Sequence, residues 1–551
     1  MPDLKLLWGD FHTHLTDFDR GDEILADARE NIDFCAVLCY PFVWEVKKGL
    51  RVESVRNRPE FADWWERLRD LCRRHHAPGE FVTFLGYEWH GDRTRYGDHN
   101  VIYFDEDNPL DDAWTLEELY ANLRRTRAFA IPHHTGYFPG RRGKDWSVWD
   151  ERLSPVMEIC SIHGSSEGPL APVDMVSNAS MGPRASGGTF QDALARGHRI
   201  GVIASNDYVG LQGRWGIGRA AVWAEDCTRE AIWEAILARR TYGVTGDRIE
   251  LRFRINGQPM GSVLQASGAI DAEVEAIGSH AIDRIELLHS NRVVATYTHP
   301  KTRLPLPPGE GCGEGEIARD PDAGRREDVG SAGASPSHAT GETRARRYKL
   351  RIEAGWGPAD RYGFEAKDIP WDMRLDVAGG KVVSVERCFN RFGQRIVSQD
   401  GGHVAWHLLT RGRRSQSPGG MTQSIVVEIE GTPDTRLRLT VDDVTTDGLP
   451  RELTVADLLA GHCLIPLVEE SERRVLDTFG ITAEEMINPD PIFHNARKVK
   501  LHQAIPEAAY TASATFEGIE LLPGRNALYV RVSQLNGQLA WSSPIWVDAP
   551  E

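Results

Sequence analysis

The sequence predicts an α/β barrel followed by a region of antiparallel β-sheet. Short apolar runs alternate with helical patterns over the first 246 residues, which is typical of a parallel sheet whose strands are joined by helices. The number of these units favours a closed barrel, and an open doubly wound sheet is the alternative. From residue 247 the pattern changes to two-residue alternation, which is typical of strands with one buried face. We therefore expect two parts, residues 1–246 and 247–551.

The first part is expected to alternate strands and helices. Its expected strands are the apolar runs 5–8, 34–39, 81–86, 101–104, 128–131, 156–160 and 200–204. Its expected helices are the stretches with helical spacing at 23–29, 59–76, 116–127, 189–197 and 229–240.

The second part is expected to be antiparallel. It opens with alternation over residues 249–255, followed by Asn256-Gly257, a turn pair that signals a hairpin. Further alternating stretches predict one or two sandwich-like units, at 282–288, 348–354, 425–430, 437–441 and 528–532. Residues 305–346 contain almost no large apolar side chains, so we expect a mobile insertion there.

Composition and charge exclude several classes of function. The chain has 551 residues, of which 41% are hydrophobic and 26% charged, as in ordinary folded proteins of several domains. Its 64 basic and 81 acidic residues give a net charge of −17, which argues against binding to nucleic acid or anionic membranes. A local basic pocket for a small anion stays open.

The chain is expected to be cytoplasmic, because it contains neither an apolar run of membrane-spanning length nor the apolar core of a signal peptide. The eight cysteines are scattered along the chain, so we expect free thiols. The sequence leaves the oligomeric state open.

Imidazoles and carboxylates gather where the expected strands end, which is where an α/β barrel carries its reactive groups. Because His12 and His14 are one residue apart, both side chains project to the same side of an extended strand and can share a metal ion. Glu88 follows the third strand, and a carboxylate can bridge two ions. His133 and His134, after the fifth strand, can complete the shell. We therefore expect a divalent metal site for Zn, Mn or Fe.

Several segments resemble a known family. LLWGDFHTHL, GYEWHG, GDHN, PHHTGY, MEICSIHGSSEG and REAIWEAILARRTYGVTGDRIEL resemble the polymerase and histidinol phosphatase (PHP) superfamily, in the branch catalogued as DUF3604. The closing SQLNGQLAWSSPIWV resembles the end of that branch. The resemblance implies a distorted (β/α)7 PHP-type barrel, up to three divalent metals and hydrolysis of phosphate esters. It also implies metal ligands, namely His12 and His14, the bridging Glu88, His133 or His134, and His163.

The sequence departs from the family pattern at two places. Leu38-Cys39-Tyr40 stands where the family has Thr-Asp-His, and Ser205-Asn206-Asp207-Tyr208 stands where it has Ser-Asp-x-His. Both lost imidazoles belong to one metal, so one or two ions are expected. Asn206 would be a neutral and weaker ligand, and Asp207 could replace it only if the strand bulges there. Tyr40 and Tyr208 either contact substrate as acid or base, together with Asp207, or simply pack in the vacated space.

Basic and imidazole side chains near the strand ends indicate an anionic substrate. His90, Arg93, His99, Arg141 and Arg214 are the expected substrate-binding residues. Glu167 is expected near the mouth, where it would position substrate. Together with the metal site, the family resemblance implies a metal-dependent hydrolase of the phosphoesterase type acting on a small molecule. The alternatives are a lyase or non-phosphate hydrolase that uses the two tyrosines, and a barrel that binds a ligand without catalysis.

Overall fold

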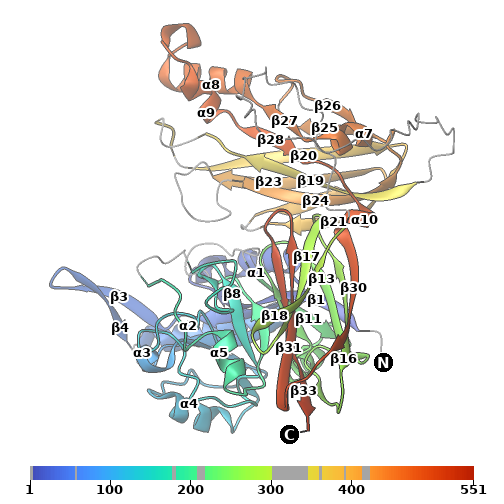
Figure 1. Ribbon diagram of the computed structural model, residues 1–551. Coiled ribbons are helices and arrows are strands. Elements are labelled where there is room, and N and C mark those ends of the chain that lie inside the picture. Colours follow the sequence, from blue (N-terminus) through green and yellow to red (C-terminus); the bar gives the residue numbers. More distant parts are fainter. Residues whose placement is uncertain are drawn as a thin grey trace, which may run out of the picture.

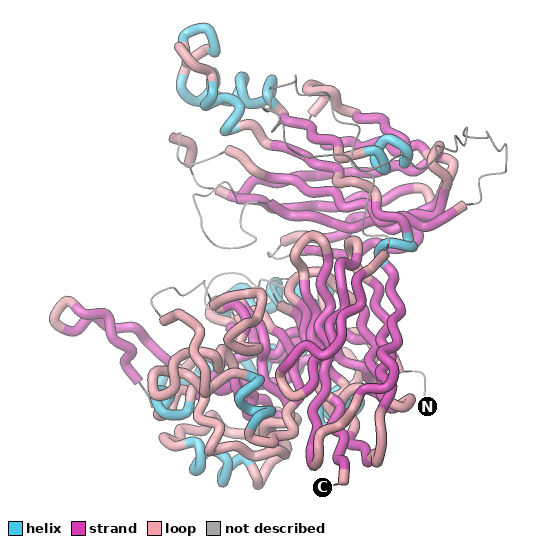
Figure 2. Tube along the Cα trace, viewed as in Figure 1, coloured by secondary structure: helices cyan, strands magenta, loops and turns pink. Residues whose placement is uncertain are grey.

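The computed structural model describes residues 4–55, 59–175, 181–207, 218–300, 345–358, 363–365, 367–389, 393–411, 422–442 and 444–550. The chain is a mixed α/β protein in which strands dominate, as Figure 2 shows. Almost all of the expected insertion at 305–346 lies outside the described residues, as do Tyr208 and Arg214.

Each expected strand of the first part is present. The strands are β1 (Lys5–His14), β2 (Phe34–Cys39), β3 (Phe42–Lys47), β4 (Leu50–Val55), β5 (Val82–Trp89), β6 (His99–Tyr103), β7 (Ala128–Pro132), β8 (Val156–Ser161), β9 (Gly164–Ser165), β10 (Gly201–Ala204), β11 (Arg219–Ala224) and β12 (Thr241–Val244). The helices are η1 (Phe18–Arg20), α1 (Gly21–Asn31), α2 (Pro59–His75), α3 (Arg93–Tyr96), α4 (Leu116–Leu123), α5 (Phe190–Ala195) and α6 (Arg229–Leu237).

Strands β2 and β5 are buried on both faces, which explains why they read as unbroken apolar runs. On one face, Val37 and Leu85 share a core with α1, α2 and α4. On the other face, Ala36 and Phe84 pack in a core that includes Trp233 of α6. Packing on both faces therefore holds in place the strands whose ends carry the candidate site.

The expectation of a parallel sheet is correct for only part of the first half. β1, β2 and β5 are parallel, and β8 is parallel to β10, but β6 runs antiparallel to both β5 and β7. Residues 90–98 connect β5 to β6, and a parallel crossover needs a dozen or more residues. β8 and β10 form a separate small sheet with β9.

The second part is rich in antiparallel sheet. Its strands are β13 (Glu250–Ile255), β14 (Gln258–Pro259), β15 (Val263–Gln265), β16 (Ile270–Ile277), β17 (Ile282–His289), β18 (Arg292–Thr298), β19 (Arg346–Gly355), β20 (Asp368–Ala378), β21 (Lys381–Cys388), β22 (Arg395–Gln399), β23 (His403–Arg411), β24 (Thr422–Gly431), β25 (Arg436–Val441), β26 (Arg451–Thr454), β27 (Cys463–Pro466), β28 (Lys498–Leu501), β29 (Ile505–Pro506), β30 (Thr511–Ile519), β31 (Gly524–Gln534), β32 (Leu539–Ser542) and β33 (Ile545–Ala549). Its helices are α7 (Val455–Ala460), α8 (Val468–Phe479), η3 (Ala483–Glu485), α9 (Asp490–Asn495) and α10 (Glu507–Tyr510).

The end of the chain returns to the first part. β32 pairs with β12, so β31, β32 and β33 belong to the same 13-stranded sheet as β1 and β2. In Figure 1 these last strands stand beside the N-terminal half, and the sheets of residues 346–504 form an upper body. The boundary between residues 246 and 247 stays a prediction, since hydrogen bonding is continuous across the two parts.

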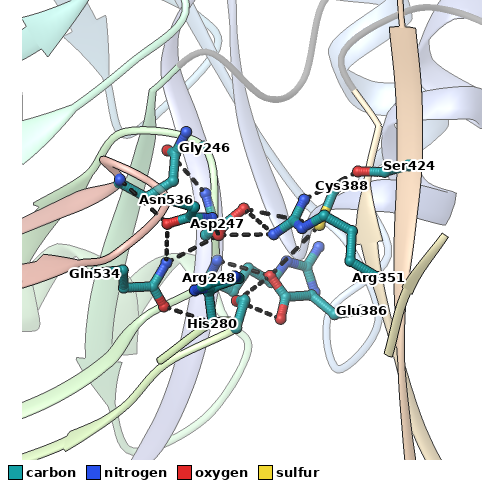
Figure 3. A network of polar contacts seen from close by, with 12 residues as sticks. Gly246, Asp247, Arg248, His280, Arg351, Glu386, Cys388, Ser424, Gln534 and Asn536 are labelled. Carbon is teal, nitrogen blue, oxygen red and sulfur yellow. Dashed lines mark hydrogen bonds and ion pairs between the residues drawn. The ribbon is translucent and has the colours of Figure 1, made fainter. Parts of the chain in front are cut away.

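A polar network joins the upper body to the rest of the chain (Figure 3). Arg351 of β19 donates two hydrogen bonds of 2.7 Å to the carboxylate of Asp247. The amides of Gln534 and Asn536 donate to the same carboxylate at 2.9 and 2.8 Å. Glu386 of β21 accepts the Arg248 backbone N–H at 2.8 Å. Asp247 therefore connects three separate stretches of sequence.

The cysteines and the helices bear on two further expectations. Seven of the eight cysteines lie among them, and all seven are free thiols. Within the same residues, no helix is both long and apolar enough to cross a membrane.

Candidate metal centre

A buried cluster of imidazoles and carboxylates lies where several strands of the first part end. His12 and His14 close β1, Glu88 is near the end of β5, His133 follows β7, and Asp207 follows β10. All five residues are buried. The polar ends of strands that are otherwise apolar are thus brought together in one place.

His12 lies between two carboxylates. Its Nδ1 is 2.7 Å from Oε2 of Glu158, and its Nε2 is 3.2 Å from Oδ1 of Asp207. Asp207 has a positive φ of 53°, and its backbone N–H donates to the carbonyl of His12 at 3.2 Å. This turn after β10 directs the Asp207 side chain towards His12.

Glu88 forms the second centre of the cluster. Its Oε2 is 3.1 Å from Nε2 of His14, and its Oε1 is 2.5 Å from Nε2 of His90. Nε2 of His133 lies 3.6 Å from Oε1. One carboxylate therefore faces imidazoles from three different stretches, which is the arrangement that a bridging ligand requires.

Asp98, His134 and Arg142 form a group at one side of the cluster. Oδ2 of Asp98 is 3.1 Å from Nε2 of His134 and 2.9 Å from Nε of Arg142. Nη2 of Arg142 is 3.4 Å from Nε2 of His134. This guanidinium is partly exposed, so it adds a positive charge at the edge of the cluster.

His163 connects this side to Asp207. Its Nε2 is 3.2 Å from Oδ2 of Asp207, and its Nδ1 is 2.5 Å from the hydroxyl of Tyr137. With one ring nitrogen held by a phenol, the other is directed towards the carboxylate, as in the outer shell of known metal-binding histidines.

The donor atoms fit a divalent metal. Groups whose ligand atoms all lie within 4.8 Å of one another include His12, His133, Glu158 and Asp207; His12, His14 and Glu88; Glu88, His133 and His134; His134, His163 and Asp207; and Glu88, His90 and Asp98. Nδ1 of His14, both ring nitrogens of His133 and Oε1 of Glu158 have no hydrogen-bond partner in the described part of the chain. Buried polar atoms are rarely left unpaired, so these are available to a cation.

Burial and the neighbouring carboxylates set the charge states in the cluster. Burial alone would lower the pKa of His12, but Asp207 and Glu158 outweigh it and raise that pKa to about 10. Burial lowers the pKa of His14 and of His163 to about 4, so both rings are neutral at pH 7. His14 and His163 are therefore in the neutral form that binds metal, whereas His12 has to release a proton when it becomes a ligand.

The structure brings most of the expected catalytic and metal-binding residues together. The ring of Tyr40 stands edge-on to His14 and His90, with centroid distances of 5.1 and 5.3 Å. Asn206 donates its backbone N–H to Asp10 at 3.2 Å, and its side-chain Oδ1 has no hydrogen-bond partner among the described residues.

Only some of the expected substrate-binding residues border the cluster. Nη1 of Arg93 is 3.2 Å from Nδ1 of His90, so it borders the cluster. His99 is buried beside Trp89, with ring centroids 5.7 Å apart. Arg141 is exposed and donates to the carbonyl of Gly140 at 2.7 Å. Its neighbour Arg142 borders the cluster instead.

The expectation for Glu167 is wrong. Glu167 is fully buried and does not reach the mouth, because Arg531, Tyr529 and Trp541 of the C-terminal strands hold its carboxylate at 2.8 to 3.0 Å. The carboxylate of Asp10 accepts the backbone N–H of His12 at 2.7 Å. It therefore fixes the backbone of β1 beside His12.

Glu158, Asp98, Tyr137 and Arg142 are not among the site residues expected from the sequence. A signal existed for Glu158, because it is the one acidic residue in the apolar strand VMEICS, and a buried carboxylate requires a partner. Nothing in the local sequence distinguishes Arg142 from Arg141, since the choice depends on the positive φ of 75° at Arg142.

Comparisons with known proteins show what the chain is similar to. The family model "Protein of unknown function (DUF3604)" matches residues 27–137 and 195–274. An uncharacterized protein of Chlamydia pneumoniae is 24% identical over 317 residues, covering 53% of this chain and 49% of that protein. One of Chlamydia muridarum is 25% identical over 282 residues, covering 48% and 43%. The chain spans about half the length of the curated relatives that it matches.

One solved structure is similar in part. It is a two-domain protein from Bacteroides vulgatus that contains a predicted PHP-like metal-dependent phosphoesterase. The match has a TM-score of 0.29 and 13% sequence identity, and it covers 52% of this chain and 80% of that one.

Proposed function

We propose that the chain is a metal-dependent hydrolase of the phosphoesterase class that holds one or two divalent ions. The observation that carries this proposal is the convergence of buried imidazoles and carboxylates from separate strand ends. Several of their ring nitrogens and one carboxylate oxygen have no hydrogen-bond partner among the residues that the structure describes. In this proposal the first part is a distorted PHP-type barrel of the DUF3604-like branch, and the substrate is a small anion in the cytoplasm. Zn, Mn and Fe suit this mixed nitrogen and oxygen donor set.

The chain's own residues have separable roles in this proposal. Glu88 would be shared between two ions, His12, His14 and His133 would supply nitrogen ligands, and Asp207 would stand in for the carboxylate missing at Asn206. A bound divalent metal supplies Lewis-acid polarisation and lowers the pKa of water. Arg142 and Arg93 lie where a guanidinium can bind and orient an anionic substrate.

The first test measures metal and activity together. We expect purified protein to contain about one to two ions per chain, given the donor set. Glu88→Gln and His12→Ala are expected to lower metal affinity at least about tenfold, because mutation of a residue that only supports a ligand already lowers it by that much. Elemental analysis and a panel of phosphate esters give the two readouts.

The matched control is Glu353→Gln, which alters another carboxylate–imidazole contact, 2.7 Å long, with His502 in the upper body. It should leave metal content and turnover unchanged. Absence of metal after supplementation with Zn, Mn and Fe would contradict the proposal. Metal binding without turnover of any phosphate ester would favour a non-phosphate reaction or a ligand-binding role.

A further inference from the structure

A second pocket lies in the first part of the chain, outside the metal centre. It has a volume of about 360 Å³ and is bordered by α3, by residues 139–146 and by the end of α5. That volume is within the range of sites for small organic molecules. None of the clustered imidazoles or carboxylates described above lines it.

The lining of this pocket is basic. Arg95, Lys144 and Arg196 line it, and the one acidic lining residue is Asp145. The Asp145 carboxylate already accepts two hydrogen bonds from Ser147, at 2.9 Å from the N–H and 2.7 Å from the hydroxyl. A chain of net charge −17 thus has an excess of positive charge at this pocket.

Lys144 is the most informative lining residue. Its side chain is fully buried, and its ammonium group donates to the carbonyl of Val148 at 2.8 Å. Over the described ranges, no carboxylate lies within ion-pair distance of Lys144. Burial lowers its pKa to about 7, because the nearby carboxylates of Asp145 and Glu117 offset the cost of the buried charge only in part. An anion in the adjoining pocket would supply a further counter-charge.

The pocket is also held in shape before any ligand arrives. The Lys144 backbone N–H donates to the carbonyl of Thr135 at 3.2 Å, which ties this segment to the turn after β7. The indole N–H of Trp146, another lining residue, donates to the carbonyl of Gly188 at 2.8 Å. A pre-formed pocket loses less entropy when it binds a ligand.

We propose that this pocket binds a phosphate-class anion, either free phosphate or the phosphoryl group of a small metabolite. Arg95 and Arg196 would contact the anion from the exposed side, and the buried ammonium of Lys144 would attract it through its charge. Arg196 has no ion-pair partner in the part of the chain that the structure describes, so its guanidinium is available. The site requires no metal, and it goes beyond the proposed hydrolase activity.

The test uses the full chain after removal of metal, so that phosphate has no ion to bind. Calorimetric titration with inorganic phosphate, in buffer free of other multivalent anions, is expected to give saturable binding. Arg196→Ala and Lys144→Met are each expected to weaken it about tenfold or more, since the first removes a charge-assisted contact and the second removes a positive charge beside the pocket. Arg125→Ala removes an exposed charge elsewhere in the same half and should change nothing.

A second titration identifies the source of the anion. Tighter binding of glucose 6-phosphate than of phosphate, with none of glucose, indicates the phosphoryl group of a metabolite, and the reverse order indicates free phosphate. If Lys144→Met does not fold, Arg95→Ala replaces it. Absence of saturable binding of either anion, or unchanged affinity in Arg196→Ala, would overturn the proposal. Because the protein is metal-free, neither result depends on the hydrolase proposal.

Discussion

At the scale of single residues, Tyr137 offers a test that leaves every proposed ligand in place. Its hydroxyl lies 2.5 Å from Nδ1 of His163, so it orients the ring whose other nitrogen faces Asp207. We expect Tyr137→Phe to weaken metal binding by about 10- to 100-fold, the usual effect of losing such a partner. Competition with a chelator measures it.

The control is Tyr120→Phe, because Tyr120 is also buried and hydrogen-bonded, to Ser154 at 3.0 Å, but takes no part in the cluster. Equal metal affinity in the two variants would show that the Tyr137 hydroxyl does not support the site.

Residue spacing predicts some of the candidate site and not the rest. His12-x-His14 and Glu88 can be identified from sequence because an extended strand fixes where their side chains point. Asp98 and Arg142 cannot, since they meet at His134 only through the turn that follows β7. Contacts that depend on the backbone angles of a loop leave no periodic signal.

At the scale of elements, the C-terminal strands hold the segment that carries His163. Arg531 of β31 makes two hydrogen bonds to the buried carboxylate of Glu167, and nearby Ser166 accepts the N–H of Gly136 at 3.1 Å. Arg531→Met would leave Glu167 without its counter-charge, at a cost of about 3–5 kcal/mol of stability. We also expect weaker metal binding, because His163 would lose its fixed position.

The matched variant is Glu286→Gln, since Glu286 contacts Nε of Arg531 at 2.8 Å but does not touch Glu167. It should retain full metal affinity. Thermal unfolding and metal titration are measured on both variants. If Arg531→Met unfolds earlier yet binds metal as tightly as the wild type, the C-terminal strands stabilise the fold without positioning the site.

Element identity was easier to predict than element pairing. Apolar runs located the strands of the first part, but strand direction depends on connection length, and the short 90–98 connection makes β6 antiparallel. The hairpin β3–β4 was not anticipated, although its strands alternate and Lys48-Gly49 has the positive φ values of a tight turn. The sequence does not predict which strands of the second part pair with the first part, because long-range pairing leaves no local pattern.

At the scale of the whole molecule, stability should depend on the network around Asp247 (Figure 3). Burial alone would raise the pKa of Asp247, but Arg351 and the amide of Asn536 outweigh it and hold that pKa below its ordinary value. Asp247→Asn removes the carboxylate that pairs directly with the buried Arg351 guanidinium. We expect a loss of about 3 kcal/mol at neutral pH, measured by denaturant unfolding.

The pH dependence of that loss gives the sharpest test. A carboxylate with a depressed pKa in the folded state contributes its full stability above the unfolded pKa of about 4, and loses it as the pH falls towards the folded value. The difference between wild type and Asp247→Asn should therefore be constant at neutral pH and shrink below about pH 4. Asp376→Asn is the control, because its ion pair with Arg374 is at the surface and is worth at most about 1 kcal/mol. A difference that stays constant down to low pH would mean that Asp247 acts through hydrogen bonds alone, and that its charge does not hold the upper body to the rest of the chain.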